Sequence, residues 1–95
     1  KNLDELPFTN RTKIDVNLYH DYYIYNMRTP FVVMMASRGC AFNCSFCTSP
    51  DIWGGTVRYR SPHNVVDEIE LEIREHGIKY ISFADDIFGL QKKLI

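Results

Sequence analysis

Residues 31–47 read FVVMMASRGCAFNCSFC, an apolar run that passes straight into a loop with three cysteines. The run over 31–36 follows a proline and contains aromatic and β-branched residues. This composition is typical of a strand buried on both faces, as in a parallel sheet. The turn signal Ser37-Arg38-Gly39 ends the run. We therefore predict a buried strand that delivers the chain directly into the cysteine loop.

The segment over 39–60 lacks a helical period and contains Pro50, Gly54 and Gly55. We predict a long loop here, and long loops in compact domains are usually functional. Ser61 then suits the N-cap of a helix, and Pro62 suits its first helical position.

The helix that starts at Pro62 is predicted to be amphipathic and to end at His76. Its apolar residues recur at helical spacing: Val65, Val66, Ile69 and Ile73. Asp67 and Glu68 are interpreted as acids that stabilise the first turn through the helix dipole. Gly77, followed by an apolar residue, favours a Schellman-type stop. A second strand is predicted over 78–84.

The order strand, loop, helix, strand is one βαβ unit with parallel strands and a right-handed crossover. One such unit cannot bury its own faces, and a complete (β/α)8 barrel takes on the order of 250 residues. We predict an α/β fold, the N-terminal βαβ portion of a partial TIM-type barrel preceded by a linker. Residues 1–29 are predicted to be a linker or connector from a missing N-terminal domain, and residues 30–95 the start of the core domain.

Composition narrows the class of protein. Eleven Lys and Arg against twelve Asp and Glu give a net charge of −1, which argues against a nucleic-acid partner. No apolar run approaches the roughly twenty residues of a membrane span. We expect a cytoplasmic protein without a membrane span.

The three cysteines, Cys40, Cys44 and Cys47, have the spacing C-x3-C-x2-C. Their crowding into one loop indicates a metal site rather than a disulfide framework. Three thiolates can each bind one iron of a cubane cluster and leave the fourth iron open. A structural zinc site in an interaction module is the alternative. It needs a fourth ligand, and none of the three histidines lies at a zinc-type spacing.

The motif C-x3-C-x-Phe-C directly after a buried strand resembles the signature of the radical S-adenosylmethionine (SAM) enzymes. The resemblance implies a [4Fe-4S] cluster on the three cysteines, whose open iron binds the amino and carboxylate groups of SAM. It further implies reductive cleavage of SAM to a 5′-deoxyadenosyl radical, with Phe46 packed near the adenine. A small-molecule substrate and an external electron donor of the flavodoxin or ferredoxin type are also implied.

Further segments extend this resemblance: Trp53-Gly54, Arg58–Pro62 and Asn64–Ile69. They are similar to radical SAM enzymes with an N-terminal cobalamin-binding domain, the group that includes anaerobic magnesium-protoporphyrin monomethyl ester cyclase. Cobalamin would then bind in a domain outside this chain, because no Asp-x-His-x-x-Gly motif is present. A radical SAM methylthiotransferase acting on RNA is an alternative, weakened by the lack of a basic face.

Three more residues are predicted to bind a cofactor. Asp85 and Asp86 follow the second strand, where α/β folds place their ligands. Many radical SAM enzymes have Gly-Gly-Glu here, so contact with SAM or substrate competes with capping of a following helix. Arg60 is predicted to orient a SAM carboxylate or a substrate anion, since arginine binds carboxylates through two parallel hydrogen bonds.

Overall fold

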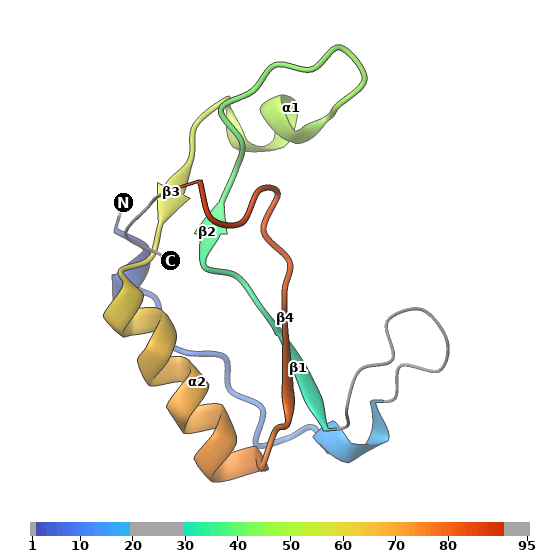
Figure 1. Cartoon of the computed structure of the whole chain (residues 1–95), viewed down its shortest axis with the longest axis vertical. Helices are drawn as coiled ribbons and strands as arrows, with labels where there is room; N and C mark the ends of the chain where they lie inside the picture. Colours follow the sequence, from blue (N-terminus) through green and yellow to red (C-terminus); the bar gives the residue numbers. More distant parts are fainter. Residues whose placement is uncertain (1, 20–29, 91–95) are drawn as a thin grey trace.

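The computed structural model describes residues 2–19 and 30–90 (Figure 1). The elements, in chain order, are η1 (Leu3–Glu5), η2 (Val16–Leu18), β1 (Phe31–Met34), β2 (Ser37–Arg38), α1 (Ser49–Trp53), β3 (Arg58–Tyr59), α2 (Pro62–His76) and β4 (Tyr80–Phe83). Figure 1 shows the loop that carries the cysteines at one end of the molecule, together with α1. Among the described helices, none is long and apolar enough to cross a membrane.

Strands β1 and β4 are parallel, and α2 connects them. The register runs from Phe31 opposite Tyr80 to Met34 opposite Phe83. The predicted α/β class with parallel strands is thereby confirmed, whereas the larger barrel stays a prediction. Strand β1 is shorter than predicted because the chain leaves β4 after Met34 and pairs with β3 instead.

The core lies between the two-stranded sheet and α2. Val32, Met34 and Ile78 are buried there, and three partly buried side chains pack against them: Ile69, Ile81 and Phe83. Val33 points to the other face and is 49% exposed, since successive side chains of a strand alternate between faces. The prediction that this strand is buried on both faces is therefore wrong for the described residues, because α2 covers only one face.

Helix α2 has the bounds that the sequence predicts. The Ser61 hydroxyl accepts a hydrogen bond from the Asn64 amide at 3.2 Å and so caps the first turn. Gly77 ends the helix with a φ of +61°, and its amide donates to the Ile73 carbonyl at 3.0 Å. This single bond is that of the αL motif, not the pair of bonds of a Schellman motif.

The faces of α2 differ from the prediction. Glu68 and Glu72 are buried at 4% and 1% exposure, whereas Val66 and Ile73 are about half exposed. The interpretation of Glu68 as a simple helix-dipole acid is wrong. Glu72 forms an ion pair with Arg11, and Glu68 lies 2.6 Å from Nη1 of Arg60. Apolar periodicity alone did not reveal these partners, because they lie far from α2 in sequence or just before its cap.

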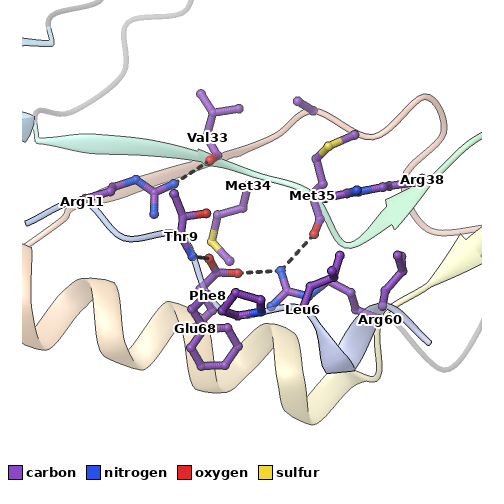
Figure 2. Close-up of a pocket in the computed structure, with 13 residues that line it drawn as sticks. Leu6, Phe8, Thr9, Arg11, Val33, Met34, Met35, Arg38, Arg60 and Glu68 are labelled. Carbon is purple, nitrogen blue, oxygen red and sulfur yellow. Dashed lines mark hydrogen bonds and ion pairs between the residues drawn. The ribbon is translucent and has the colours of Figure 1, made fainter. Parts of the chain in front are cut away.

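The same two arginines cover the free edge of β1. Arg11 donates from Nη2 to the Val33 carbonyl at 3.0 Å, and Arg60 donates from Nη1 to the Met35 carbonyl at 3.0 Å (Figure 2). The intervening Met34 carbonyl accepts from the Ala84 amide, on the β4 side. Because carbonyls alternate between the edges of a strand, the guanidinium groups occupy the edge that β4 leaves open.

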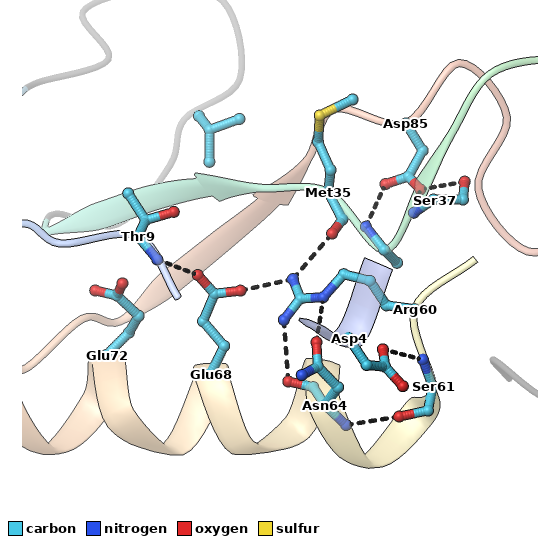
Figure 3. Close-up of polar contacts among 12 residues, drawn as sticks. Asp4, Thr9, Met35, Ser37, Arg60, Ser61, Asn64, Glu68, Glu72 and Asp85 are labelled. Carbon is cyan, nitrogen blue, oxygen red and sulfur yellow. Dashed lines mark hydrogen bonds and ion pairs between the residues drawn. The ribbon is translucent and has the colours of Figure 1, made fainter. Parts of the chain in front are cut away.

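The described part of the predicted linker, residues 2–19, packs against this unit. Thr9 donates its amide to Glu68 at 3.2 Å, and Asp4 accepts from the amide of Ser61 at 2.8 Å (Figure 3). Leu3 and Val16 are buried. Residues 2–19 therefore pack against the βαβ unit, and their role as a linker or connector stays a prediction. Residues 20–29, also assigned to the linker, lie outside the described residues.

The predicted long loop contains two regular elements. Pro50 lies in the first turn of α1. Gly54 ends this helix with a φ of +69°, and its amide donates a hydrogen bond to the Pro50 carbonyl at 2.8 Å. Strand β3 pairs with β2 in the antiparallel sense, with Arg38 opposite Arg58. The prediction of an irregular loop was wrong here, because five helical residues and two-residue strands are too short to show a period. The cysteine loop thus leaves and returns through a two-stranded ribbon.

Gly39 sits where this ribbon meets the cysteine loop. Its φ is +97°, and a Cβ atom there would lie 2.1 Å from the Thr56 carbonyl oxygen and 3.2 Å from Cβ of Trp53. The two ends of the loop therefore approach so closely that only glycine fits at this position.

The substitution Glu68→Ala is expected to lower the free energy of unfolding by about 3–5 kcal/mol, because it leaves the Arg60 guanidinium buried without its carboxylate. Glu70, on the same helix and exposed, is the matched control, and Glu70→Ala should change stability by less than about 0.5 kcal/mol. Urea unfolding of the full-length protein measures the free energy of unfolding of both variants. Equal stability of the two variants would contradict the buried ion pair.

The substitution Gly39→Ala is expected to destabilise the protein more than Gly55→Ala. Both glycines have positive φ, so each variant bears a strain of roughly 1–2 kcal/mol, but no atom lies within 4 Å of a Cβ at Gly55. Only the Gly39 variant also collides with backbone. Thermal unfolding of the intact protein would show this difference, and equal melting temperatures would exclude the close approach.

Candidate metal centre

The three cysteines occupy one loop between β2 and α1. Cys40 follows Gly39 and is buried, whereas Cys44 and Cys47 are exposed. All three are free thiols. The buried ribbon end thus fixes the first cysteine, and the other two lie on the exposed part of the loop.

Backbone amides of the loop donate to two of the sulfurs. The Phe42 amide lies 3.4 Å from Sγ of Cys40, and the Ser49 amide lies 3.4 Å from Sγ of Cys47. The Cys47 amide donates a hydrogen bond to the Cys44 carbonyl at 3.0 Å. This bond closes a turn that contains the second and third cysteines. Hydrogen bonds to sulfur stabilise negative charge on it, as iron–sulfur sites require of their ligands.

The chemistry of these donors fits an iron–sulfur cluster. Three thiols within eight residues supply three soft ligands, and two of them already accept amide hydrogen bonds. Within residues 2–19 and 30–90, no three His, Cys, Asp or Glu side chains converge closely enough to hold a metal ion. The assignment of the ligands therefore depends on thiol chemistry and spacing.

The imidazoles that the zinc alternative requires are not at this loop in the described structure. His76 is the last residue of α2, where its Nε2 lies 3.9 Å from Glu72. His63 is exposed in the first turn of the same helix, and His20 lies outside the described residues.

Asp85 and Asp86 lie just past β4, and both bind the start of the cysteine loop. Asp85 accepts hydrogen bonds from the Ala36 amide at 3.1 Å, from the Ser37 amide and from the Ser37 hydroxyl at 2.5 Å (Figure 3). Asp86 accepts from the Gly39 amide at 3.2 Å. These carboxylates therefore tie the end of β4 to the residues before Cys40, while their contact with SAM stays a prediction.

Arg60, the predicted anion-binding residue, uses all three of its nitrogens within the fold. Nε donates to the Asn64 side chain at 2.6 Å, and Nη2 donates to the Asn64 carbonyl at 3.0 Å. Nη1 bonds Glu68 and the Met35 carbonyl. These contacts favour a structural role, and none of them points toward a cofactor.

The side chain of Phe46 is 91% exposed. Phe42, on the same loop, is 54% exposed. Apolar rings this open to water are suited to cover a ligand or another part of the protein. The prediction that Phe46 packs near an adenine is compatible with this position and stays a prediction.

Several residues that support the loop were not among those predicted to bind a metal or a cofactor. Position 39 requires glycine because the Thr56 carbonyl lies so close to it. In the sequence, only the turn signal Ser37-Arg38-Gly39 indicated this position. Arg58 lies over the ring of Trp53, 5.8 Å from its centroid, near the returning end of the loop. Ser49 is buried at the start of α1 and carried no distinguishing sequence signal.

A pocket of about 340 Å³ lies elsewhere in the described part of the chain. Its lining comes from the N-terminal segment, from β1 and from α2, and includes Phe8, Arg60 and Glu68 (Figure 2). None of the three cysteines lines it. This pocket belongs to the packing of residues 2–19 and not to the candidate metal centre.

Comparison with known proteins relates this chain to longer sequences. An uncharacterized methyltransferase of Pyrococcus horikoshii is 39% identical over 93 residues, which are 98% of this chain and 19% of that protein. Cytidylyl-2-hydroxyethylphosphonate methyltransferase of Streptomyces wedmorensis is 35% identical, over 88% of this chain and 16% of its own length. Anaerobic magnesium-protoporphyrin IX monomethyl ester cyclase of Cereibacter sphaeroides is 43% identical, over 75% of this chain and 12% of its own length.

The chain thus spans less than a fifth of the length of each of these relatives. No solved structure is significantly similar to it. The Radical SAM superfamily matches residues 34–95, which include the last residue of β1, the cysteine loop, α2 and β4. With this match and with relatives similar over nearly its whole length, the chain belongs to the Radical SAM superfamily.

Proposed function

We propose that this chain is the cluster-binding part of a radical SAM enzyme, with Cys40, Cys44 and Cys47 as the ligands of a [4Fe-4S] cluster. The observation that supports this most directly is the position of the three thiols, on one loop between β2 and α1 in a chain of this superfamily. The zinc-module alternative is not carried forward, because superfamily membership accounts for the same cysteines.

The residues of this chain have two tasks at the cysteine loop: some hold the start of the loop in place, and others bind the metal. Asp85 and Asp86 hold the start of the loop in place by accepting hydrogen bonds from the amides of residues 36, 37 and 39. The thiols hold the metal, and amides 42 and 49 stabilise negative charge on two sulfurs. When bound, the cluster supplies the electron that cleaves SAM to a 5′-deoxyadenosyl radical.

For SAM itself, we propose that Phe46 packs against the adenine and that Asp86 meets the amino group. The Phe46 ring is exposed on the cysteine loop. Asp86 uses Oδ2 for the Gly39 amide, and its carboxylate has a second oxygen that can accept another hydrogen bond. Both residues come from the end of the unit where α/β folds place their ligands.

For the whole protein, we propose a cytoplasmic enzyme that uses cobalamin in a domain outside this chain and acts on a small molecule. Two of the relatives described above are named methyltransferases, and the third is named a cyclase of a porphyrin ester. These names support methyl transfer as the reaction class over ring closure. An external flavodoxin- or ferredoxin-type protein would supply the electron. We further propose that β1, α2 and β4 open a partial barrel.

The intact protein, reconstituted without oxygen, is expected to be brown and to carry about four irons per chain. Adding SAM to the reduced cluster should change its electron paramagnetic resonance signal, and dithionite should then yield 5′-deoxyadenosine. The substitution Cys44→Ala removes one of three protein ligands and should abolish both effects. Ser45, exposed beside it, is the control, and Ser45→Ala should preserve both. Stoichiometric zinc without iron, or a cluster indifferent to SAM, would refute the proposal.

The substitution Asp86→Asn is expected to leave the iron content unchanged and to weaken SAM binding about ten- to a hundredfold. The reason is that a charge-assisted hydrogen bond contributes roughly 1.5–3 kcal/mol. Equilibrium binding of SAM to the anaerobic protein measures the change, with Asp51→Asn, exposed on α1, as the control. Unaltered affinity in the Asp86 variant would restrict that carboxylate to anchoring the Gly39 amide.

A further inference from the structure

Ser49 carries a buried hydroxyl that the fold does not use. The residue is 6% exposed, and within the described part of the chain its Oγ has no hydrogen-bond partner. Buried polar side chains nearly always have a partner, so such a hydroxyl calls for a specific explanation. The missing acceptor is therefore to be sought among groups that bind beside this residue.

Helix capping does not explain the hydroxyl. Ser49 is the first residue of α1, but the N-cap is Thr48, and neither side chain makes a capping bond to the helix. The first-turn amides at residues 51 and 52 bond the Thr48 carbonyl instead, at 3.0 and 3.2 Å. The serine side chain thus contributes nothing to the start of this five-residue helix.

The position of Ser49 relates it to the metal centre. Its backbone amide donates to Sγ of Cys47 at 3.4 Å, so the residue already contacts one of the three thiols. A cluster held by Cys47 would bring its own sulfides to this metal centre, and both sulfides and thiolates accept hydrogen bonds. The hydroxyl and this amide belong to the same residue, which places an unused donor beside the Cys47 ligand position.

We propose that Ser49 is a positioning residue of the metal centre, whose hydroxyl donates a hydrogen bond to a sulfur of the cluster held by Cys47. This inference rests on the proposed function, because it requires the cluster. It assigns to Ser49 two donors to the metal centre, the amide and the hydroxyl. The exposed Ser45, two residues before Cys47, has no such contact and provides a natural comparison.

A hydrogen bond from the Ser49 hydroxyl should raise the reduction potential of the cluster. Reduction adds one negative charge to the cluster, and a hydrogen-bond donor stabilises the more negative state more strongly. Hydrogen bonds to the sulfurs therefore raise the reduction potential. Ser49 should make the cluster easier to reduce, and removing its hydroxyl should move the midpoint potential to more negative values.

The test is the midpoint potential of the reconstituted intact protein, read from the electron paramagnetic resonance signal at a series of poised potentials without SAM. The substitution Ser49→Ala should shift the midpoint to a more negative potential at unchanged iron content. Ser49→Thr, which keeps the hydroxyl, should stay near the parent value, and Ser45→Ala should match it. SAM is left out so that the result does not depend on turnover.

Each other outcome counts against the inference. A midpoint potential of the Ser49→Ala variant equal to that of the parent protein overturns it while leaving the proposed function intact. If Ser49→Ala holds no iron, Ser49→Gly takes its place. Loss of iron from both, with a normal Ser49→Thr variant, also overturns the inference, because the hydroxyl would then serve assembly and not the potential. A parent protein that binds no cluster refutes the proposed function itself.

Discussion

The carboxylate of Asp85 is the contact on which the placement of the cysteine loop depends. Ala36 and Ser37 are almost fully buried where β1 gives way to β2, and both need partners for their amides. Asp85 accepts from both amides and from the Ser37 hydroxyl. Hydrogen bonds to an ionised carboxylate are stronger than those between neutral groups. The end of β4 therefore fixes the point at which the chain turns toward Cys40.

A second constraint holds the helix against the strands. The pairs Arg60–Glu68 and Arg11–Glu72 lie between α2 and the open edge of β1, and each arginine also bonds a main-chain carbonyl there. Buried ion pairs contribute little net stability relative to apolar packing, but losing one partner is costly. Their contribution here is geometric, since a guanidinium group satisfies edge carbonyls that an apolar side chain would leave without donors.

The sequence predicted the elements with strong local signals. Ser61, Pro62 and Gly77 gave the bounds of α2, and the spacing of the three cysteines gave the candidate ligands. The sequence did not reveal which face of α2 is buried, because the answer lies in Arg11, about sixty residues away. It also could not distinguish ligand contact from anchoring for Asp85 and Asp86, since both roles place an acid past the same strand.

The cysteine loop is held in place where it begins, at Gly39 and Cys40, and is exposed where it carries Cys44 and Cys47. This difference explains why polar contacts are concentrated at the start of the loop. Gly39 must pass close to Thr56, and Cys40 is buried beside it, so the first thiol is placed by backbone contacts. Cys44 and Cys47 are exposed, so these two thiols lie on the open side of the loop. Rigid support of a reactive group by buried hydrogen bonds is the general condition for a precise site. In this chain the supporting groups come from β4 and the β2–β3 ribbon, so correct folding of the βαβ unit precedes a correctly shaped metal centre.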